Sequence, residues 1–224
     1  MDRALLVVSA LVLALVGAGC GSRTTETDAG AGVDSGGADA GTPLDAGHME
    51  HDSGAPRDAG SDRDATASVI CSIHCNLVMM ACTTTHQQYT DMAQCLATCG
   101  AFPPGTAADR SGNSVACRTY AAGNARMGMP ETNCPAAGPL GNDVCGSPCE
   151  GFCSVALHVC TGARAAYGSM TECMTECAAY APGDYSTAST SGDTLACRMY
   201  HATAASVDPA THCGHIGPDS PPCM

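Results

Sequence analysis

Apolar residues are spread unevenly along the chain, which divides into three regions. Ala4 to Val16 is a predominantly apolar run of thirteen residues, whereas residues 20–67 contain almost no large apolar side chain. From Ser68 onward apolar residues are interspersed with regularly spaced cysteines, and residues 69–83 and 90–99 contain neither proline nor glycine. This last pattern predicts two helices joined by a turn near residues 86–89.

An eight-cysteine spacing occurs twice in this last region. From Cys71 the successive intervals are 4, 7, 13, 4, 18, 17 and 11 residues, and from Cys149 they are 4, 7, 13, 4, 20, 16 and 10. The repeat extends beyond cysteine, because residues 111–122 and 191–202 share the pattern Ser-Gly-x-x-x-Ala-Cys-Arg-x-Tyr-x-Ala. The chain therefore contains two tandem modules, residues 68–146 and residues 147–224.

Each module has few large apolar side chains. Residues 68–224 contain only seventeen Leu, Ile, Val and Phe residues, and the chain has no tryptophan. Small domains of this composition bury too little surface to be stable without cross-links. We therefore expect the sixteen cysteines of the modules to form structural disulfides, each contributing roughly 3 kcal/mol on the chain-entropy model.

Cysteines four residues apart share one face of a helix, and each module has two such pairs. In an antiparallel hairpin the outer cysteines meet each other and so do the inner ones. This predicts the bridges Cys71–Cys99, Cys75–Cys95, Cys149–Cys177 and Cys153–Cys173. The arrangement resembles, in geometry only, the twin C-x3-C hairpins of mitochondrial intermembrane-space chaperones.

A third helix is expected after Ser111-Gly112, with Asn113 as its N-cap, and after Ser191-Gly192, with Asp193 as its N-cap. It would bring Cys117 to Cys82 and Cys197 to Cys160, which leaves Cys134–Cys145 and Cys213–Cys223 by elimination. Eight cysteines allow 105 connectivities, so the assignment is a hypothesis. The expected fold class is mainly α: two disulfide-stapled modules, each a helical hairpin plus a third helix with Pro/Gly-rich loops, after a disordered linker.

The N-terminal apolar run is too short to span a bilayer, which takes about 20 apolar residues. It ends in Gly17-Ala18-Gly19-Cys20, which resembles the lipobox of bacterial lipoproteins. The resemblance implies that residues 1–19 are a signal peptide, that Cys20 is lipidated, and that Gly21, which is not aspartate, directs the protein to the outer membrane. Removing Cys20 from seventeen cysteines leaves an even number for the modules. The alternative is ordinary secretion, with Cys20 discarded or free.

Residues 20–67 have the composition of a disordered tether, with ten acidic residues against three arginines. The whole chain carries a formal charge of −13 and contains no lysine. Because nucleic-acid binding needs a basic surface, nucleic acid is excluded as an expected partner. Adsorption to anionic lipid by charge is disfavoured for the same reason, which leaves Cys20 as the expected contact with a membrane.

No catalytic, haem-binding or zinc-knuckle motif occurs in the sequence, so we expect neither an enzyme nor a cofactor. His201, His212 and His215 of module 2 are candidate metal ligands, because histidine clusters suit copper or zinc. The aligned residues of module 1 are alanine, asparagine and alanine. The string His48-Met49-Glu50-His51 is interpreted as a solvated spacer. Arg118 and Arg198, with Tyr120 and Tyr200, recur in both modules and could form a ligand-binding pair. The favoured interpretation is structural: the arginines cap carbonyls or pair an acid, and the tyrosines pack in the small cores.

The sequence as a whole is similar to cysteine-rich predicted lipoproteins of bacteria. We expect a binding or structural interaction protein without catalysis, lipid-anchored at the cell envelope, whose partner is an unidentified envelope or extracellular protein or glycan. The alternative is an extracytoplasmic metal-binding (copper or zinc) or redox protein that uses the histidines of module 2.

Overall fold

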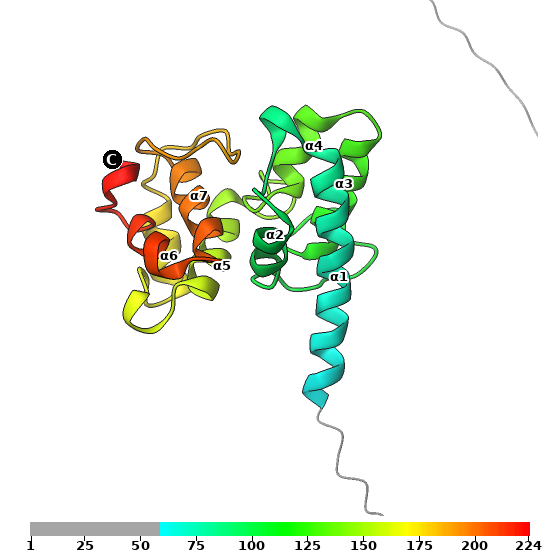
Figure 1. Cartoon of the computed structure of the whole chain (residues 1–224), viewed down its shortest axis with the longest axis horizontal. Coiled ribbons are helices and arrows are strands. Elements are labelled where there is room, and N and C mark those ends of the chain that lie inside the picture. The colour runs from blue at the N-terminus through cyan, green and yellow to red at the C-terminus, as the bar shows by residue number, and fades with distance from the viewer. Residues whose placement is uncertain (1–58) are drawn as a thin grey trace, which may run out of the picture. The chain divides into compact units, whose positions relative to one another are not determined.

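The computed structural model describes residues 59–224, and side chains from residue 67 (Figure 1). The predicted signal peptide, Cys20, the His48–His51 string and most of the predicted linker lie outside this range. The described part is helical and contains no strand. Its elements are α1 (Ala59–Ala81), η1 (Thr84–His86), α2 (Met92–Cys99), α3 (Val115–Arg126), α4 (Pro130–Ala137), α5 (Pro148–Val159), η2 (Gly162–Arg164), α6 (Met170–Cys177), α7 (Leu195–Ala205), α8 (Pro209–His212), η3 (Cys213–His215) and η4 (Pro221–Cys223).

α1 begins at Ala59, within the last nine residues of the predicted linker. Once a helix is nucleated, each further residue adds a backbone hydrogen bond at little cost. None of the helices of residues 59–224 is long and apolar enough to cross a bilayer.

The helix starts are fixed by short polar side chains. Asp91 accepts a hydrogen bond from the backbone N–H of Gln94 at the start of α2, and Ser147 forms a capping box with Glu150 at the start of α5. The caps of α3 and α7 are Ser114 and Thr194, one residue after the predicted Asn113 and Asp193. Those two side chains instead accept hydrogen bonds from arginines, as described below.

The two predicted hairpins are confirmed. α1 packs against α2 in module 1 and α5 against α6 in module 2 (Figure 1). All four predicted hairpin bridges are present, with Cα–Cα distances of 5.7 to 5.8 Å: Cys71–Cys99, Cys75–Cys95, Cys149–Cys177 and Cys153–Cys173. These bridges follow from the i, i+4 spacing of the cysteines, which places each pair on one helix face, and from the antiparallel arrangement of the two helices.

The other four bridges differ from the prediction. The observed pairs are Cys82–Cys134, Cys117–Cys145, Cys160–Cys213 and Cys197–Cys223. The predicted pairs Cys82–Cys117, Cys134–Cys145, Cys160–Cys197 and Cys213–Cys223 are therefore wrong. All sixteen cysteines of the modules are nevertheless bonded, and no bridge links one module to the other.

The difference arises in the segment after α3, where the Pro/Gly pattern predicts a loop but the chain forms α4. Pro130 occupies the first turn of α4, where its missing N–H costs nothing. α4 contacts η1 and α1, which brings Cys134 to the end of α1 at Cys82. The start of α3 meets the end of the module instead, because the N–H of Gly112 donates to the carbonyl of Val144 at 3.1 Å.

The two modules pack against each other at several places along module 1. The side chain of Asn113 donates to Ser154 Oγ on α5 at 2.9 Å. Gly151 allows the backbone of α5 to approach closely, because a Cβ there would lie 3.0 Å from the Cα of Leu140. Near the other end, Ser206 after α7 contacts Thr98 of α2 at 3.3 Å between the hydroxyl oxygens. Residues 59–224 accordingly belong to one compact unit.

Candidate metal centre

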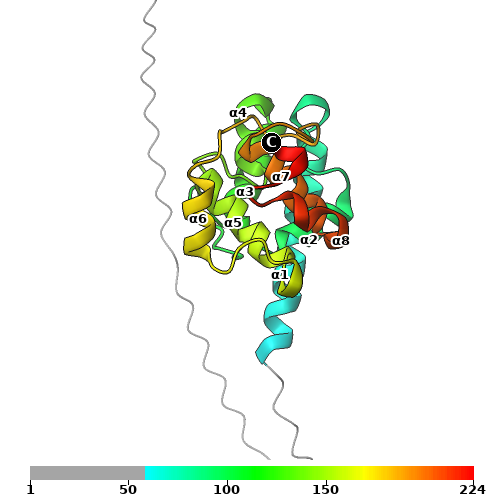
Figure 2. The same cartoon turned by 90° about the vertical axis from the view of Figure 1, so that its left-hand side faces the viewer.

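The three candidate histidines of module 2 come together in the structure. His201 lies on α7, His212 ends α8 and His215 ends η3. One ring nitrogen from each lies within 4.8 Å of the other two. In Figure 2, α8 and the chain after it lie close to α7, the helix that carries the first of the three. We call this set the histidine cluster.

Local capping and a disulfide hold the elements that carry the cluster. Thr194 starts α7 by accepting the N–H of Cys197 at 3.1 Å, and Asp208 starts α8 by accepting the N–H of Thr211 at 3.3 Å. Cys213 lies between His212 and His215 in the sequence and is bonded to Cys160. The turn that presents the last two histidines is therefore cross-linked to the end of α5.

The hydrogen bonds of His201 define its tautomer. Its Nε2 lies 3.3 Å from the carbonyl oxygen of Thr190, so Nε2 carries the proton and donates. Its Nδ1 is then a bare lone pair, 3.0 Å from Nδ1 of His212, which must donate to it. A ring fixed by a second-shell carbonyl with its other nitrogen directed inward is the usual arrangement of a metal-binding histidine. Nδ1 of His215 is buried and has no hydrogen-bond partner within the described residues.

The cluster favours uncharged imidazoles. Burial lowers the pKa of His201 to about 4; the hydrogen bond to Thr190 opposes this shift, and the neighbouring His215 and His212 add to it. The pKa of His212 is also lowered, mainly by burial, although Asp208 opposes the shift. Both rings are therefore neutral at pH 7, which is the form that binds metal ions.

The arrangement suits coordination of a metal ion by imidazole nitrogens, with further coordination positions of the ion left open. His201 is buried, whereas His212 and His215 are half-buried, so the cluster is accessible from solvent on one side. Tyr200 stands edge-on to His201, with ring centroids 5.1 Å apart. Cys197 and Cys223 also lie near His201, but they are bonded to each other and offer no thiolate.

The recurring arginines are structural, as predicted. Arg118 is buried and donates to the carbonyl oxygens of Gly138 and Pro139, each at 3.2 Å, and its guanidinium lies 3.7 Å from the centroid of the Phe102 ring. Its counterpart in module 2, Arg198, donates to the carbonyl oxygen of Pro218.

The side chains of Asn113 and Asp193 each accept a hydrogen bond from the arginine of their own module, at 2.8 and 3.1 Å. The prediction for Tyr120 is wrong, because its ring is 44% exposed and stacks under Arg110. Tyr200 is half-buried and packs against the core of module 2.

The sequence pattern did not predict the burial of His74. His74 is buried in module 1, edge-on to Tyr89 with ring centroids 6.3 Å apart. The aligned residue of module 2, Phe152, forms the same edge-on pair with Tyr167, and that alignment was the available signal.

Comparison with known families agrees with the duplication. The BfoA family C-terminal domain matches the chain twice, over residues 45–148 and 149–221. The two matches meet at the first cysteine of module 2, close to the boundary predicted from the repeat. No curated protein and no solved structure matches the chain. The chain therefore belongs to the BfoA family, whose C-terminal domain it matches in two parts, one over each module.

Proposed function

We propose that this protein binds a divalent transition-metal ion, Cu²⁺ or Zn²⁺, through the histidine cluster. The observation that carries the proposal is the convergence of three imidazoles from three separate elements, with ring nitrogens within 4.8 Å of one another. Imidazole is a good ligand for both ions. Three protein ligands leave at least one coordination position for water or an exogenous ligand.

The proposal also accounts for a difference between the modules. Module 1 folds around the same four bridges with Ala121, Asn133 and Ala136 at the three histidine positions. The histidines are therefore not needed for the fold. Three imidazoles lie together at one place, and two of them have a lowered pKa. This supports a role in binding rather than in the fold.

The test is a titration of the purified, oxidised full chain with Cu²⁺ and with Zn²⁺ at pH 7.4, followed by calorimetry. We expect one ion per chain. His212→Ala should weaken binding by more than tenfold, because losing a direct ligand exceeds the roughly 10- to 100-fold effect of losing a second-shell contact. For Cu²⁺, absorption of the copper–imidazole complex provides an independent measurement.

Two control variants make the titration specific. His158→Ala removes an exposed histidine of module 2 outside the cluster and should change nothing. The variant with His48 and His51 both replaced by alanine removes the other histidine-rich string and should leave the stoichiometry at one. An unchanged stoichiometry and affinity in a variant with all three cluster histidines replaced would contradict the proposal.

We further propose that the protein is lipidated at Cys20 and held at the bacterial outer membrane, outside the cytoplasm. Two observations support this location. Eight disulfides persist in oxidising compartments rather than in the cytosol. The sixteen cysteines from Cys71 to Cys223 pair entirely among themselves, so Cys20 is not required for any of them. A tether of acidic composition would then separate the modules from the lipid.

Cys20→Ser is expected to move the protein from the membrane fraction to the soluble fraction, because covalent acyl chains would be its only strong hold on the bilayer. The measurement is detergent phase partitioning of wild-type and variant protein, together with incorporation of labelled palmitate. Serine preserves size and polarity, so export should not change. A wild-type chain that partitions into the aqueous phase and takes up no label would rule out the anchor.

A further inference from the structure

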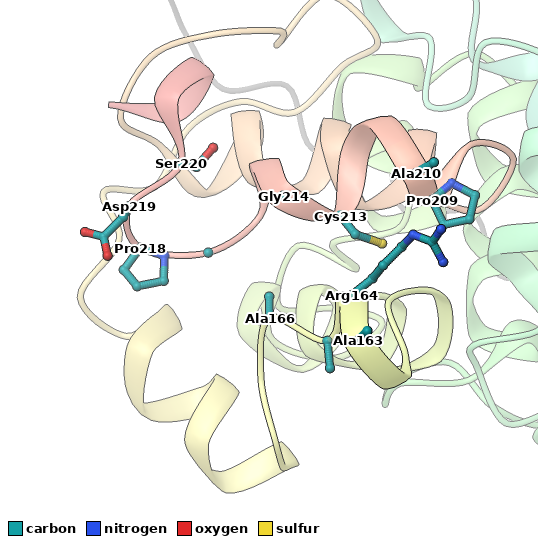
Figure 3. A pocket seen from close by; sticks show the side chains of 12 residues that line it. Ala163, Arg164, Ala166, Pro209, Ala210, Cys213, Gly214, Pro218, Asp219 and Ser220 are labelled. Atoms are coloured by element: carbon teal, nitrogen blue, oxygen red, sulfur yellow. The ribbon is translucent and has the colours of Figure 1, made fainter.

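Module 2 carries an open groove that has no part in the histidine cluster. It is a pocket of about 440 Å³ between the η2 turn and the segment from α8 to Ser220 (Figure 3). Its lining includes the small residues Ala163, Ala166 and Gly214, and Arg164 and Asp219 are exposed at its edge. In Figure 3 the side chain of Arg164 extends toward Pro209. Arg164 forms no ion pair within the described residues. We call this pocket the module 2 groove.

The same surface of module 1 is not free, because a loop of module 2 lies on it. A pocket of about 420 Å³ is lined jointly by module 1 residues and by the loop Gly183–Ser186. Its module 1 residues align with residues of the module 2 groove. The aligned pairs are Thr85 with Ala163, His86 with Arg164, Gln88 with Ala166, Glu131 with Ala210, Pro135 with Gly214 and Leu140 with Asp219.

Two backbone carbonyls of module 1 receive the loop. The hydroxyl of Tyr185, which is 8% exposed, donates to the carbonyl oxygen of Gln88 at 3.0 Å. The N–H of Thr187 donates to the carbonyl oxygen of Gln87, also at 3.0 Å. The loop is thus held by its tyrosine hydroxyl, by one main-chain hydrogen bond and by the side-chain amide of Gln88, which donates to the carbonyl oxygen of Tyr185 at 3.5 Å. The first two contacts use backbone carbonyls as acceptors, which an extended segment of another protein can also reach.

The corresponding carbonyls of module 2 belong to Ala165 and Ala166. Neither accepts a hydrogen bond from the described part of the chain. Ala166 replaces Gln88, whose side-chain amide donates to the carbonyl oxygen of Tyr185 at 3.5 Å in module 1, so the module 2 groove keeps the backbone acceptors but lacks this side-chain donor. The replacement of His86 by Arg164 puts a permanent positive charge beside the groove, whereas the loop on module 1 carries Asp184.

We propose that the module 2 groove binds an extended, tyrosine-bearing segment of a partner protein, with an acidic residue next to the tyrosine and facing Arg164. The modules of this family would then associate with their partner as module 1 associates with module 2. The groove and the histidine cluster are separate sites, so this proposal does not depend on metal binding.

A second copy of this chain does not fit the groove. Its own tyrosine loop is already bonded to its module 1, and the aligned position in module 1 is Ala107. If module 1 of a second copy docked on the groove as module 2 docks on module 1, its first helix would have to approach as closely as α5 does at Gly151. Module 1 has Ile73 at that position, and its side chain would prevent this approach. The occupant is therefore a different polypeptide.

The probe is a fluorescent peptide with the sequence of residues 181–188, Ala-Pro-Gly-Asp-Tyr-Ser-Thr-Ala, titrated with the full chain and followed by anisotropy. We expect saturable binding that weakens at least tenfold when the tyrosine of the peptide is replaced by alanine. Arg164→Glu should weaken binding about fivefold or more. Arg126→Glu, the same charge change at an exposed residue of α3, should have no effect.

A tethered version removes the dependence on peptide affinity. The same peptide is fused after the exposed Met224 through a short Gly/Ser linker, which gives an effective concentration in the millimolar range. The tyrosine fusion should melt at a higher temperature than the alanine fusion, and Arg164→Glu should reduce that difference.

Equal behaviour of the tyrosine and alanine peptides, both free and fused, would overturn the proposal. Self-association of the unmodified chain that is lost in Arg164→Glu, measured by sedimentation, would overturn the assignment of a different partner.

Discussion

Removing the Cys160–Cys213 bridge by alanine substitution is expected to lower the free energy of unfolding by about 4 kcal/mol and to weaken metal binding as well. The bridge closes a segment of 53 residues, and on the chain-entropy model this loop length gives about 4 kcal/mol. Cys213 also lies between His212 and His215, so its loss releases the turn that presents both rings. Stability is measured by denaturant unfolding and metal affinity by calorimetry.

The Cys82–Cys134 bridge is the matched control. It is the counterpart in module 1 and closes 52 residues, so its removal should cost about the same free energy of unfolding. It is remote from the histidine cluster in sequence and lies in the other module, so metal affinity should not change. Removing Cys75–Cys95, which closes only 20 residues, should cost roughly 3 kcal/mol. Equal losses of metal affinity in the two long-loop variants would show that the bridge acts through global stability alone.

The sequence predicts the hairpin bridges of each module correctly but not the other bridges. The hairpin bridges depend on spacing within and between two neighbouring helices, and that spacing is visible in the sequence. Cys82–Cys134 depends on α4, which returns the chain to the end of α1 after α3. Residues 130–137 contain Pro130 and Pro135, a pattern that predicts a loop. They form α4 because Pro130 occupies the first turn, where proline is favourable, and the helix continues past Pro135.

The histidine cluster could be predicted in part, again because of spacing in the sequence. His201, His212 and His215 are close in the sequence, so they could be proposed together. Their convergence depends on the turn after α8, and the tautomer of His201 depends on the carbonyl of Thr190, neither of which a spacing pattern specifies. The module 2 groove could not be predicted from the sequence. It is recognised only by comparison with module 1, where a loop of module 2 covers the same surface.

His74 is the least favourable element of the module 1 core. It is fully buried, and neither ring nitrogen has a hydrogen-bond partner within the described residues. Desolvation, with a smaller contribution from the charge of Arg118, lowers the pKa of His74 from 6.5 to about 3. The ring is therefore neutral in the folded protein under ordinary conditions, whereas in the unfolded chain it takes up a proton near pH 6.5.

His74→Phe, which installs the residue found at the aligned position in module 2, is expected to stabilise the protein, and increasingly so as the pH falls. At pH 7 the gain is about 1 to 3 kcal/mol, from removing two unsatisfied buried nitrogens. Below pH 6.5 the unfolded wild-type chain binds a proton that folded His74 excludes, so wild-type stability falls until about pH 3, by on the order of 4 to 5 kcal/mol. The phenylalanine variant lacks this loss.

The measurement is denaturant unfolding of wild type and variant at pH 7, 5.5 and 4. His201 and His212 also have lowered pKa values and contribute their own pH dependence. Both are present in the two proteins, so the difference between the curves isolates His74. His158→Phe, at an exposed position, should run parallel to wild type. Parallel curves for His74→Phe would mean that His74 reaches a hydrogen-bond partner, such as water, that keeps its pKa near normal, because a buried ring with two unpaired nitrogens must resist protonation.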